Sequence, residues 1–213
     1  MLQVQVLLLL AISLSAADPL TGEPGLAELA AARSAVVLVA GEGVRTVQRL
    51  DEPDQPAEPK RVRFAVAADG RYDITITDPA DPDGPRSRFL NDGVSAWSIE
   101  LADAADQAKP RRQAAIGDLM ARLLACLRLD LAALRKDYTI ELVPAAAGGL
   151  RELRLRPTDP AVLREIDAIV VQLDAAGRPT LVVLDDSSHS RQRLVVTTFT
   201  DNPPADPMWF RTP

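Results

Sequence analysis

Short segments in which polar and apolar residues alternate recur along most of this chain, with turn-forming residues between them. Two neighbouring segments, Arg61 to Ala67 and Arg71 to Thr77, are separated by Asp69-Gly70. Their alternate positions are apolar: Val62, Phe64 and Val66, then Tyr72, Ile74 and Ile76. A period of two is typical of half-buried strands, and Asp-Gly favours a tight hairpin turn. The chain is therefore expected to build an antiparallel sheet.

The same pattern continues on both sides of a central helical region. A second hairpin is expected around Asn91-Asp92-Gly93, between Arg86 to Leu90 and Val94 to Leu101. Strand patterns return later in the chain at 138–143, 150–156, 166–173, 180–184 and 194–199. Nearer the start, Ala35 to Leu50 is β-branched, and Gly41 and Gly43 indicate a bend or hairpin between two strands. The residues 51–59 and 78–85 are expected to be loops.

Helical spacing marks three segments. Leu26, Leu29 and Ala30 predict a short amphipathic helix before Ser34. After a charged, proline-containing stretch at 103–112, a leucine-rich helix is expected through Leu127. Asp130 is expected to cap a further short helix ending near Lys136. Strands, a helical insertion and more strands together predict an α+β fold, an incomplete antiparallel β-barrel or strongly curved sheet with helices covering its concave face.

The first residues have the features of an export signal. Val4 to Leu14 is an apolar run too short to span a bilayer, and Ser15-Ala16-Ala17 supplies small residues for cleavage after Ala17. No Lys or Arg precedes the run, which departs from the usual signal. We expect residues 1–17 to be a signal peptide and 18–213 a single exported domain, soluble because no cysteine near the cleavage site could accept a lipid.

Charge and cysteine content narrow the possible partners. The formal net charge of -6 argues against a nucleic-acid partner, which requires a basic face. The single cysteine, Cys126, excludes an internal disulfide, and its apolar neighbours indicate a buried small hydrophobe. Aromatic residues make up only 4% of the chain, so aliphatic side chains must line the interior.

Several possible sites fail on inspection. His189, with Asp185-Asp186 and the neighbouring serines, is better explained as a solvated hairpin turn than as a metal site or a hydrolase, and no G-x-S-x-G elbow is present. The acidic stretch from Asp78 to Gly84 lacks the first and last calcium ligands. Gly41 and Gly43 lack the third glycine of a dinucleotide motif. We expect no catalytic residue, metal or cofactor, and hence no enzyme.

From about Asn91 onward, the order of features resembles the LolA-like family of outer-membrane lipoprotein carriers. The similarity is carried by four groups of residues in the same order: Asn91-Asp92-Gly93 leading to Trp97; the leucine-rich helix followed by Asp130 to Leu134 and Tyr138; Ile169 to Leu173 followed by Asp174 and Gly177-Arg178-Pro179; and Phe199 to Pro204 with Met208-Trp209-Phe210. The last group, a strand ending in an asparagine–proline turn followed by aromatic residues, is the most telling.

The resemblance implies an incomplete barrel with helices in its opening, a dry interior for acyl chains, and carriage of cargo across the periplasm without a cofactor. The chain also departs from the family. Where well-studied members have a basic residue followed by proline that helps to hold a lid shut, this chain has Ala67-Ala68-Asp69. Arg61, Arg63 or Arg71 could substitute, and the sequence selects none of them.

We therefore expect a monomeric periplasmic carrier that holds the acyl chains of lipoproteins or lipids and exchanges them with membrane-associated donor and acceptor proteins. The expected lipid-binding residues are Phe64, Val66, Ile74, Ile76, Trp97, Leu119, Met120, Leu123 and Leu124. Periodicity does not decide whether the helix around Leu119 to Leu127 is plain core or a movable lid. Two alternatives stay open: a lipid-sensing or regulatory envelope module of the same fold, and a structural envelope protein with a filled core.

Overall fold

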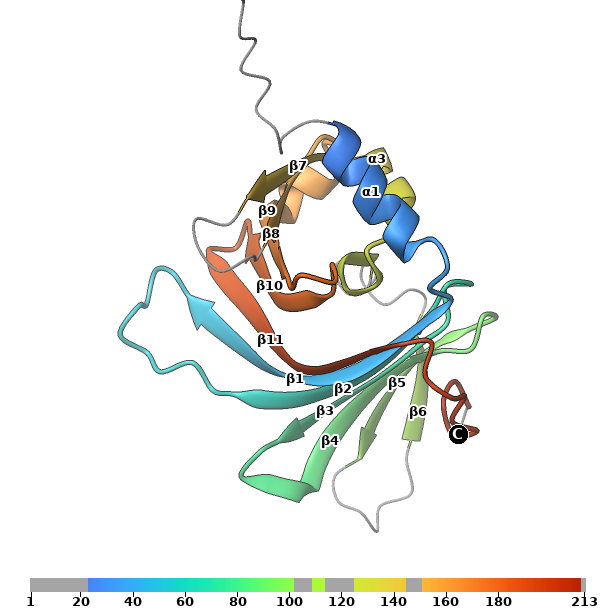
Figure 1. The fold of residues 1–213 in the computed structure, drawn as a ribbon. Coiled ribbons are helices and arrows are strands. Elements are labelled where there is room, and N and C mark those ends of the chain that lie inside the picture. Colours follow the sequence, from blue (N-terminus) through green and yellow to red (C-terminus); the bar gives the residue numbers. More distant parts are fainter. Residues whose placement is uncertain (1–22, 102–108, 114–124, 145–150, 212–213) are drawn as a thin grey trace, which may run out of the picture.

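The strands of the computed structural model form one curved antiparallel sheet around an aliphatic core (Figure 1). The structure describes residues 23–101, 109–113, 125–144 and 151–211. The strands are β1 (Leu38–Arg49), β2 (Lys60–Ala67), β3 (Tyr72–Asp78), β4 (Asp81–Asn91), β5 (Ala96–Leu101), β6 (Lys109–Gln113), β7 (Tyr138–Pro144), β8 (Arg151–Pro157), β9 (Ile166–Leu173), β10 (Pro179–Asp186) and β11 (Ser190–Asp201). The helices are α1 (Glu23–Arg33), α3 (Leu131–Asp137) and the 3₁₀ turn η1 (Val162–Arg164).

Two meanders make up the sheet, and the pairing of the first and last strands joins them. The order across the sheet is β6-β5-β4-β3-β2-β1-β11-β10-β9-β8-β7. Consecutive strands are therefore paired except β6 and β7, which lie at the two edges, and β1 pairs with β11 although the two are far apart in sequence. In Figure 1 the strands β7 to β11 curl round the core, and α1, α3 and a helical turn at 125–128 lie on the open side. The incomplete antiparallel barrel expected from the alternation is therefore confirmed.

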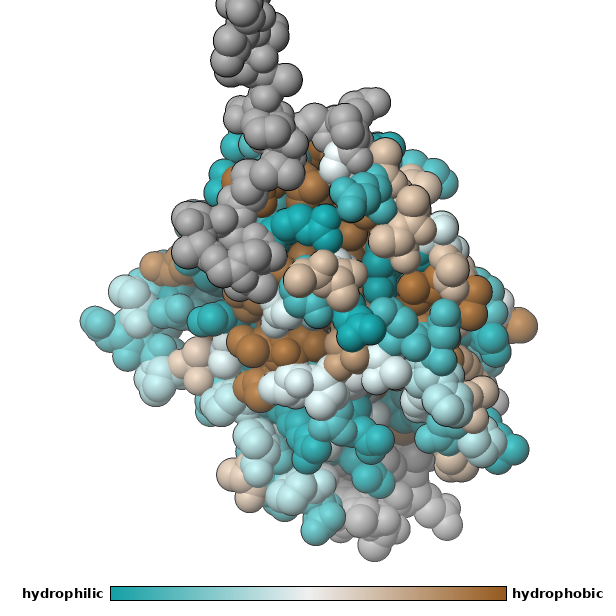
Figure 2. Space-filling view, in the orientation of Figure 1, coloured by the Kyte–Doolittle hydropathy of each residue, from teal (hydrophilic) through white to brown (hydrophobic). Residues whose placement is uncertain are grey.

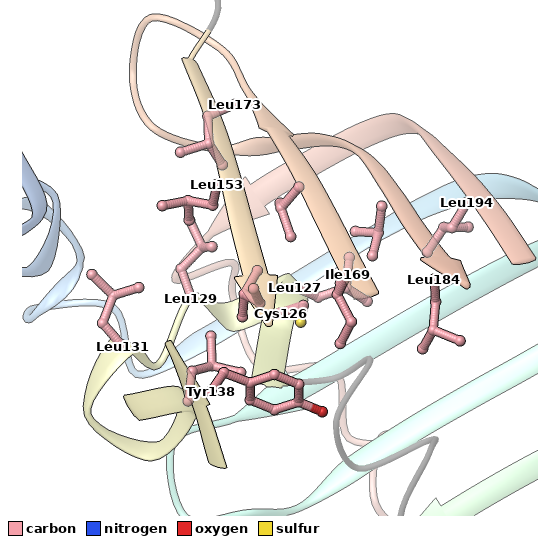
Figure 3. Packing of buried hydrophobic residues seen from close by; sticks show 14 of the residues in the cluster. Cys126, Leu127, Leu129, Leu131, Tyr138, Leu153, Ile169, Leu173, Leu184 and Leu194 are labelled. Carbon is pink, nitrogen blue, oxygen red and sulfur yellow. The ribbon is translucent and has the colours of Figure 1, made fainter. Parts of the chain in front are cut away.

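The core lies on the concave face, where both meanders contribute aliphatic side chains. Leu153, Ile169 and Leu173 from the second meander are at most 1% exposed, and Val62, Phe64 and Ile74 from the first belong to the same cluster. The helices add Leu29, Leu131 and Leu134. Cys126 and Leu127, from the helical turn, lie on the same side of the strands as Ile169 and Leu184 (Figure 3).

Three segments differ from the sequence expectation. A single strand, β1, runs through Gly41 and Gly43, and its pairing with β11 shifts register between Glu42 and Gly43. The expected break into two strands is thus wrong, because a bulge absorbs the irregularity while the strand continues. The strand β4 begins at Asp81, inside the expected loop. The short strand β6 lies in the charged stretch, and its Pro110 is tolerated because the strand is at the edge of the sheet.

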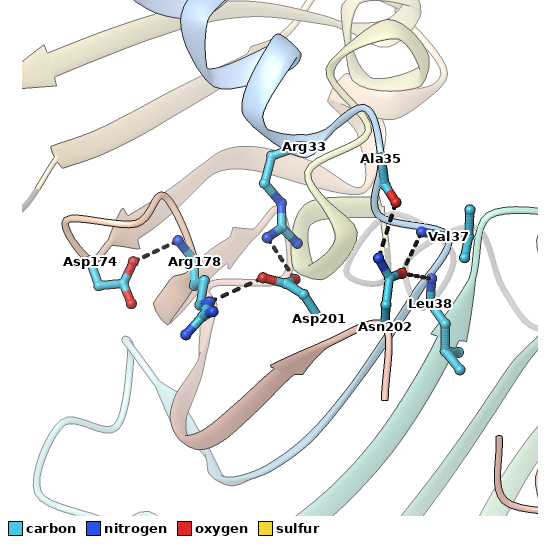
Figure 4. Close-up of polar contacts among 8 residues, drawn as sticks. All are labelled: Arg33, Ala35, Val37, Leu38, Asp174, Arg178, Asp201 and Asn202. Atoms are coloured by element: carbon cyan, nitrogen blue, oxygen red, sulfur yellow. Dashed lines mark hydrogen bonds and ion pairs between the residues drawn. The ribbon is translucent and has the colours of Figure 1, made fainter. Parts of the chain in front are cut away.

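A polar joint fixes α1 and the start of β1 to the end of β11 (Figure 4). Asn202 accepts hydrogen bonds from the backbone N–H groups of Val37 and Leu38 and donates one to the carbonyl of Ala35. Arg33 donates to the carboxylate of Asp201. The asparagine that begins the expected asparagine–proline turn therefore closes the corner between helix and sheet.

Among the described helices, none is long and apolar enough to cross a membrane.

Candidate functional site

Cross-strand pairing places rows of aliphatic side chains along the concave face. Directly paired residues of an antiparallel sheet point to the same face. One row crosses six strands from the second meander into the first: Leu142, Leu153, Val171, Val182, Leu194 and Arg45. A second row joins Gly41, Phe64, Ile74 and Phe89. The concave face is therefore a nearly continuous aliphatic surface that ends, on β1, in a cation.

A narrow apolar gap separates this face from the helical turn. It has a volume of about 10 Å³, and Val62, Phe64, Ile74, Ile76 and Leu194 from the strands face Leu127 across it. Such a volume corresponds to roughly one water molecule. Any hydrocarbon chain that enters between the strands and Leu127 must therefore move Leu127.

A wider cleft opens at the other end of the same face. Its volume is about 380 Å³, and it lies between the β2–β3 turn and residues 125–130. Val66 and Tyr72 line it from the strands, and Ala125 and Arg128 from the helical turn. Arg128 forms an ion pair with Asp130 at its rim. Apolar surface also reaches the solvent near the middle of the face seen in Figure 2.

The structure brings together four of the residues expected to bind lipid. Phe64, Ile74 and Ile76 line the gap, and Val66 lines the neighbouring cleft. Trp97 lies apart from them. It shares a face with Ala65, because Trp97 pairs with Leu90, Leu90 with Asp73, and Asp73 with Ala65. Ala65 points away from Phe64 along the strand, so Trp97 is on the convex face. Leu119, Met120, Leu123 and Leu124 lie outside the described residues.

Arg45 is the feature of this face that the sequence expectation missed. It is half-buried beside Val62, Ile76 and Leu194, and its Nη2 donates a hydrogen bond to Oε1 of Gln192 at 2.9 Å. Burial lowers the pKa of the guanidinium below its ordinary value. An arginine nevertheless stays charged at physiological pH. The concave face therefore has a cation at its edge that donates a hydrogen bond to a neutral amide.

None of the three arginines considered from the sequence faces the interior. Arg61 and Arg63 contact Glu42 at 2.7 and 3.3 Å, and Arg63 alternates with Phe64, which places it on the convex face. Arg71 binds Asp69 at 2.8 Å, and its guanidinium lies 4.9 Å from the centre of the Phe210 ring. Their positions leave Arg45 as the arginine of β1 to β3 that lines the gap.

The convex face carries a separate groove of mixed polar and apolar lining beneath the C-terminal segment. Its volume is about 590 Å³, and its lining includes Arg63, Asp73, Arg86, Arg88, Met208 and Trp209. Arg88 binds the buried carboxylate of Asp73 and also donates to the carbonyl of Met208 at 3.3 Å. This ion pair raises the pKa of the Arg88 guanidinium. Arg88 in this groove is thus paired within the chain, and Met208 and Trp209 add apolar side chains to the lining.

The turn around His189 is a hydrogen-bonded hairpin between β10 and β11. The carboxylate of Asp186 accepts from the hydroxyls of Ser188 and Ser190, and Asp185 pairs with Arg191. This confirms the interpretation of the segment as a solvated turn. In the described part of the chain, no three His, Cys, Asp or Glu side chains are grouped to hold a metal ion.

Comparison with known proteins gives similar solved structures but no sequence family. No family model matches the chain, and no curated protein matches it. Similar structures include a DUF1329 family protein from Desulfovibrio piger (12% identity, TM-score 0.44, 86% of this chain and 95% of that chain). A domain assigned to outer-membrane lipoprotein sorting from Vibrio parahaemolyticus is similar at 12% identity and TM-score 0.40, over 84% and 93% of the two chains. A LolA superfamily protein from Nitrosomonas europaea is similar at 13% identity and TM-score 0.41, over 87% and 97%.

Proposed function

We propose that this protein is a periplasmic carrier that holds the acyl chains of a lipid or lipoprotein against its concave face and delivers them towards the outer membrane. The observation that carries the proposal is the aliphatic row from Leu142 to Leu194 on the concave face. Val62, Phe64 and Ile76 lie beside Leu194 on the same face, and Leu127 covers them. Burying a methylene contributes roughly 0.8 kcal/mol, so a long chain on such a face gains several kcal/mol without a polar contact.

The covering segment supplies a means of loading and release. The helical turn at 125–128 is separated from α3 by Leu129 and Asp130, and Leu129 has a positive φ of 56°. Such backbone is uncommon for leucine. We take the helical turn at 125–128, which carries Leu127, as a lid, and Leu129 and Asp130 as its hinge. Donor and acceptor proteins at the two membranes would then exchange the cargo while the lid is open.

Native mass spectrometry tests this function on the chain from Asp18 to Pro213, purified from the periplasm without detergent. An acylated molecule bound at a defined stoichiometry would support a carrier, and lipid extraction would identify the cargo. A protein without bound lipid that also takes up no added lipopeptide would overturn the proposal in favour of a structural or protein-binding role.

A pair of matched variants ties the binding to the concave face. Ile76→Gln places an amide in the gap and is expected to weaken the binding of a fluorescent acyl probe about tenfold or more, because the amide must be desolvated beside hydrocarbon. Val195→Gln makes the same kind of change on the convex face, where Val195 is 38% exposed, and should leave the affinity unchanged. Polar substitution of Leu123 and Leu124 together should reduce the release of cargo from membranes.

A further inference from the structure

The cation at the edge of the concave face has no counter-charge among the described residues. Arg45 lies in the row that contains Val182 and Leu194, and among the described residues no carboxylate is within ion-pair distance of it. Its hydrogen bond to Gln192 uses one of the five N–H donors of a guanidinium. A half-buried charge of this kind is costly unless it is paired. The geometry therefore favours a negatively charged group supplied from outside the chain.

Arg45 also lies at the boundary between the buried and the solvent-exposed part of the concave face. Leu194, its partner on β11, is 3% exposed, whereas Val47, two residues further along the same face of β1, is 39% exposed. An acyl chain lying over Leu194 and Ile76 would therefore bring its head group out of the apolar region beside Arg45. That is the position in which an amphiphile places its charge.

A second cation lies next to Arg45 on the same face. Lys60 is the partner of Arg45 on β2, and its Nζ contacts the carboxylate of Asp78 at 2.9 Å and that of Glu58 at 3.6 Å. These carboxylates neutralise Lys60. Arg45, on the neighbouring strand, has no such partner in the part of the chain that the structure describes, so its positive charge is not balanced within β1, β2 and β11.

We propose that Arg45 makes the carrier selective for acyl ligands with an anionic head group, a carboxylate or a phosphate, over uncharged acyl esters. The proposal rests on the acyl-carrier function above and specifies its ligand class. A guanidinium can donate two parallel hydrogen bonds to either anion. The aliphatic row would hold the chain, and Arg45, positioned by Gln192, would bind the acid.

Binding measurements with three probes of equal chain length test the proposal: palmitate, its uncharged methyl ester, and palmitoyl lysophosphatidic acid, each below its micelle concentration. We expect both acids to bind the full mature chain about tenfold or more tightly than the ester, the scale of a hydrogen bond to a charged group. A preference for one acid over the other would show which anion the site takes.

Variants separate this inference from the carrier function. Arg45→Gln should remove the preference, so that acids and ester bind equally well to the variant, while Arg45→Lys should keep part of the preference. Arg63→Gln, a convex-face control, should change nothing, and thermal unfolding establishes that each variant is folded. Equal binding of acids and ester by the unmodified protein would overturn the role of Arg45 and leave the carrier function standing. Binding of none of the three probes would overturn both.

Discussion

Arg33 and Asp201 form an ion pair of 2.7 Å that fastens the last residue of α1 to the last residue of β11. The side chain of Arg33 is only 4% exposed and that of Asp201 22%. The Arg33 guanidinium also lies 5.6 Å from the centre of the Phe199 ring, which is 6.1 Å from that of Phe64. The guanidinium of Arg33 therefore connects α1, on the open side of the sheet, with the rings of Phe199 and Phe64 on the strands.

Removing the carboxylate of this pair should be costly. Asp201→Ala is expected to lower the free energy of unfolding by about 3 kcal/mol, because Arg33 would stay buried without a counter-charge. Arg178→Gln is the matched control: Arg178 binds the same carboxylate, but its side chain is 44% exposed, so a loss below about 1 kcal/mol is expected. Urea denaturation at neutral pH measures both. Equal losses of unfolding free energy in the two variants would contradict a larger contribution from the buried Arg33–Asp201 pair.

Asn202 stabilises the same corner in two separable ways. It makes three hydrogen bonds to residues 35–38, and its φ is 46°, in the left-handed region. Asn202→Ala loses the hydrogen bonds and adds backbone strain, and should cost about 2–3 kcal/mol. Asn202→Gly loses the hydrogen bonds alone, so it should be less destabilising by about 1 kcal/mol. If thermal unfolding of purified protein ranked glycine below alanine, the backbone strain would not be a factor here.

The sequence predicted those turns and helix ends that are determined by residues close to one another in the chain. Asp69-Gly70 turns the chain between β2 and β3, with Gly70 at a φ of 89°, as expected of a hairpin carried by a glycine. Asp130 caps α3, since its side chain accepts a hydrogen bond from the N–H of Ala133 at 3.0 Å. In both places the residues that determine the conformation lie within four positions of one another, so the sequence alone contains the signal.

Long-range pairing explains what the sequence could not reveal. Val44 and Val47 are both apolar but point to opposite faces of β1, so alternation does not identify the inner face or place Arg45 on it. The register with β11 does so, and register depends on contacts about 150 residues away along the chain. The sequence pattern also did not show that Trp97 lies on the convex face. That face is determined through three successive strand pairings.

Gly41 is required by close packing within the sheet. A Cβ at this position would lie 2.1 Å from the carbonyl oxygen of Thr198 and 2.8 Å from Cζ of Phe64. Gly41→Ala is therefore expected to lower the free energy of unfolding by about 1–3 kcal/mol, as measured by chemical denaturation. The nearer atom belongs to the backbone, so adding Phe64→Leu should not restore the lost stability. A rescue by that second substitution would show that the aromatic ring causes the strain.

Cys126 offers a direct measure of whether the lid opens. The thiol is fully buried, and burial raises its pKa to about 12, so the reactive thiolate is scarce at pH 8. Without ligand, a thiol reagent should label the folded protein very slowly. Below pH 12 the rate of any reaction at the buried thiol should rise about tenfold per pH unit, since the thiolate fraction rises by that factor.

Binding of an acyl chain should change that rate. Leu127, the neighbour of Cys126, closes the gap of about 10 Å³, so a bound chain has to displace the helical turn and expose the thiol. We expect saturating palmitate to accelerate labelling at pH 8 by about tenfold or more, the effect of a shift of roughly 1.4 kcal/mol towards the open state. Leu127→Ala should accelerate labelling without ligand, because less apolar contact holds the turn in place. Tight binding of palmitate with an unchanged labelling rate would mean that the chain lies elsewhere on the concave face and that residues 125–128 belong to a fixed core.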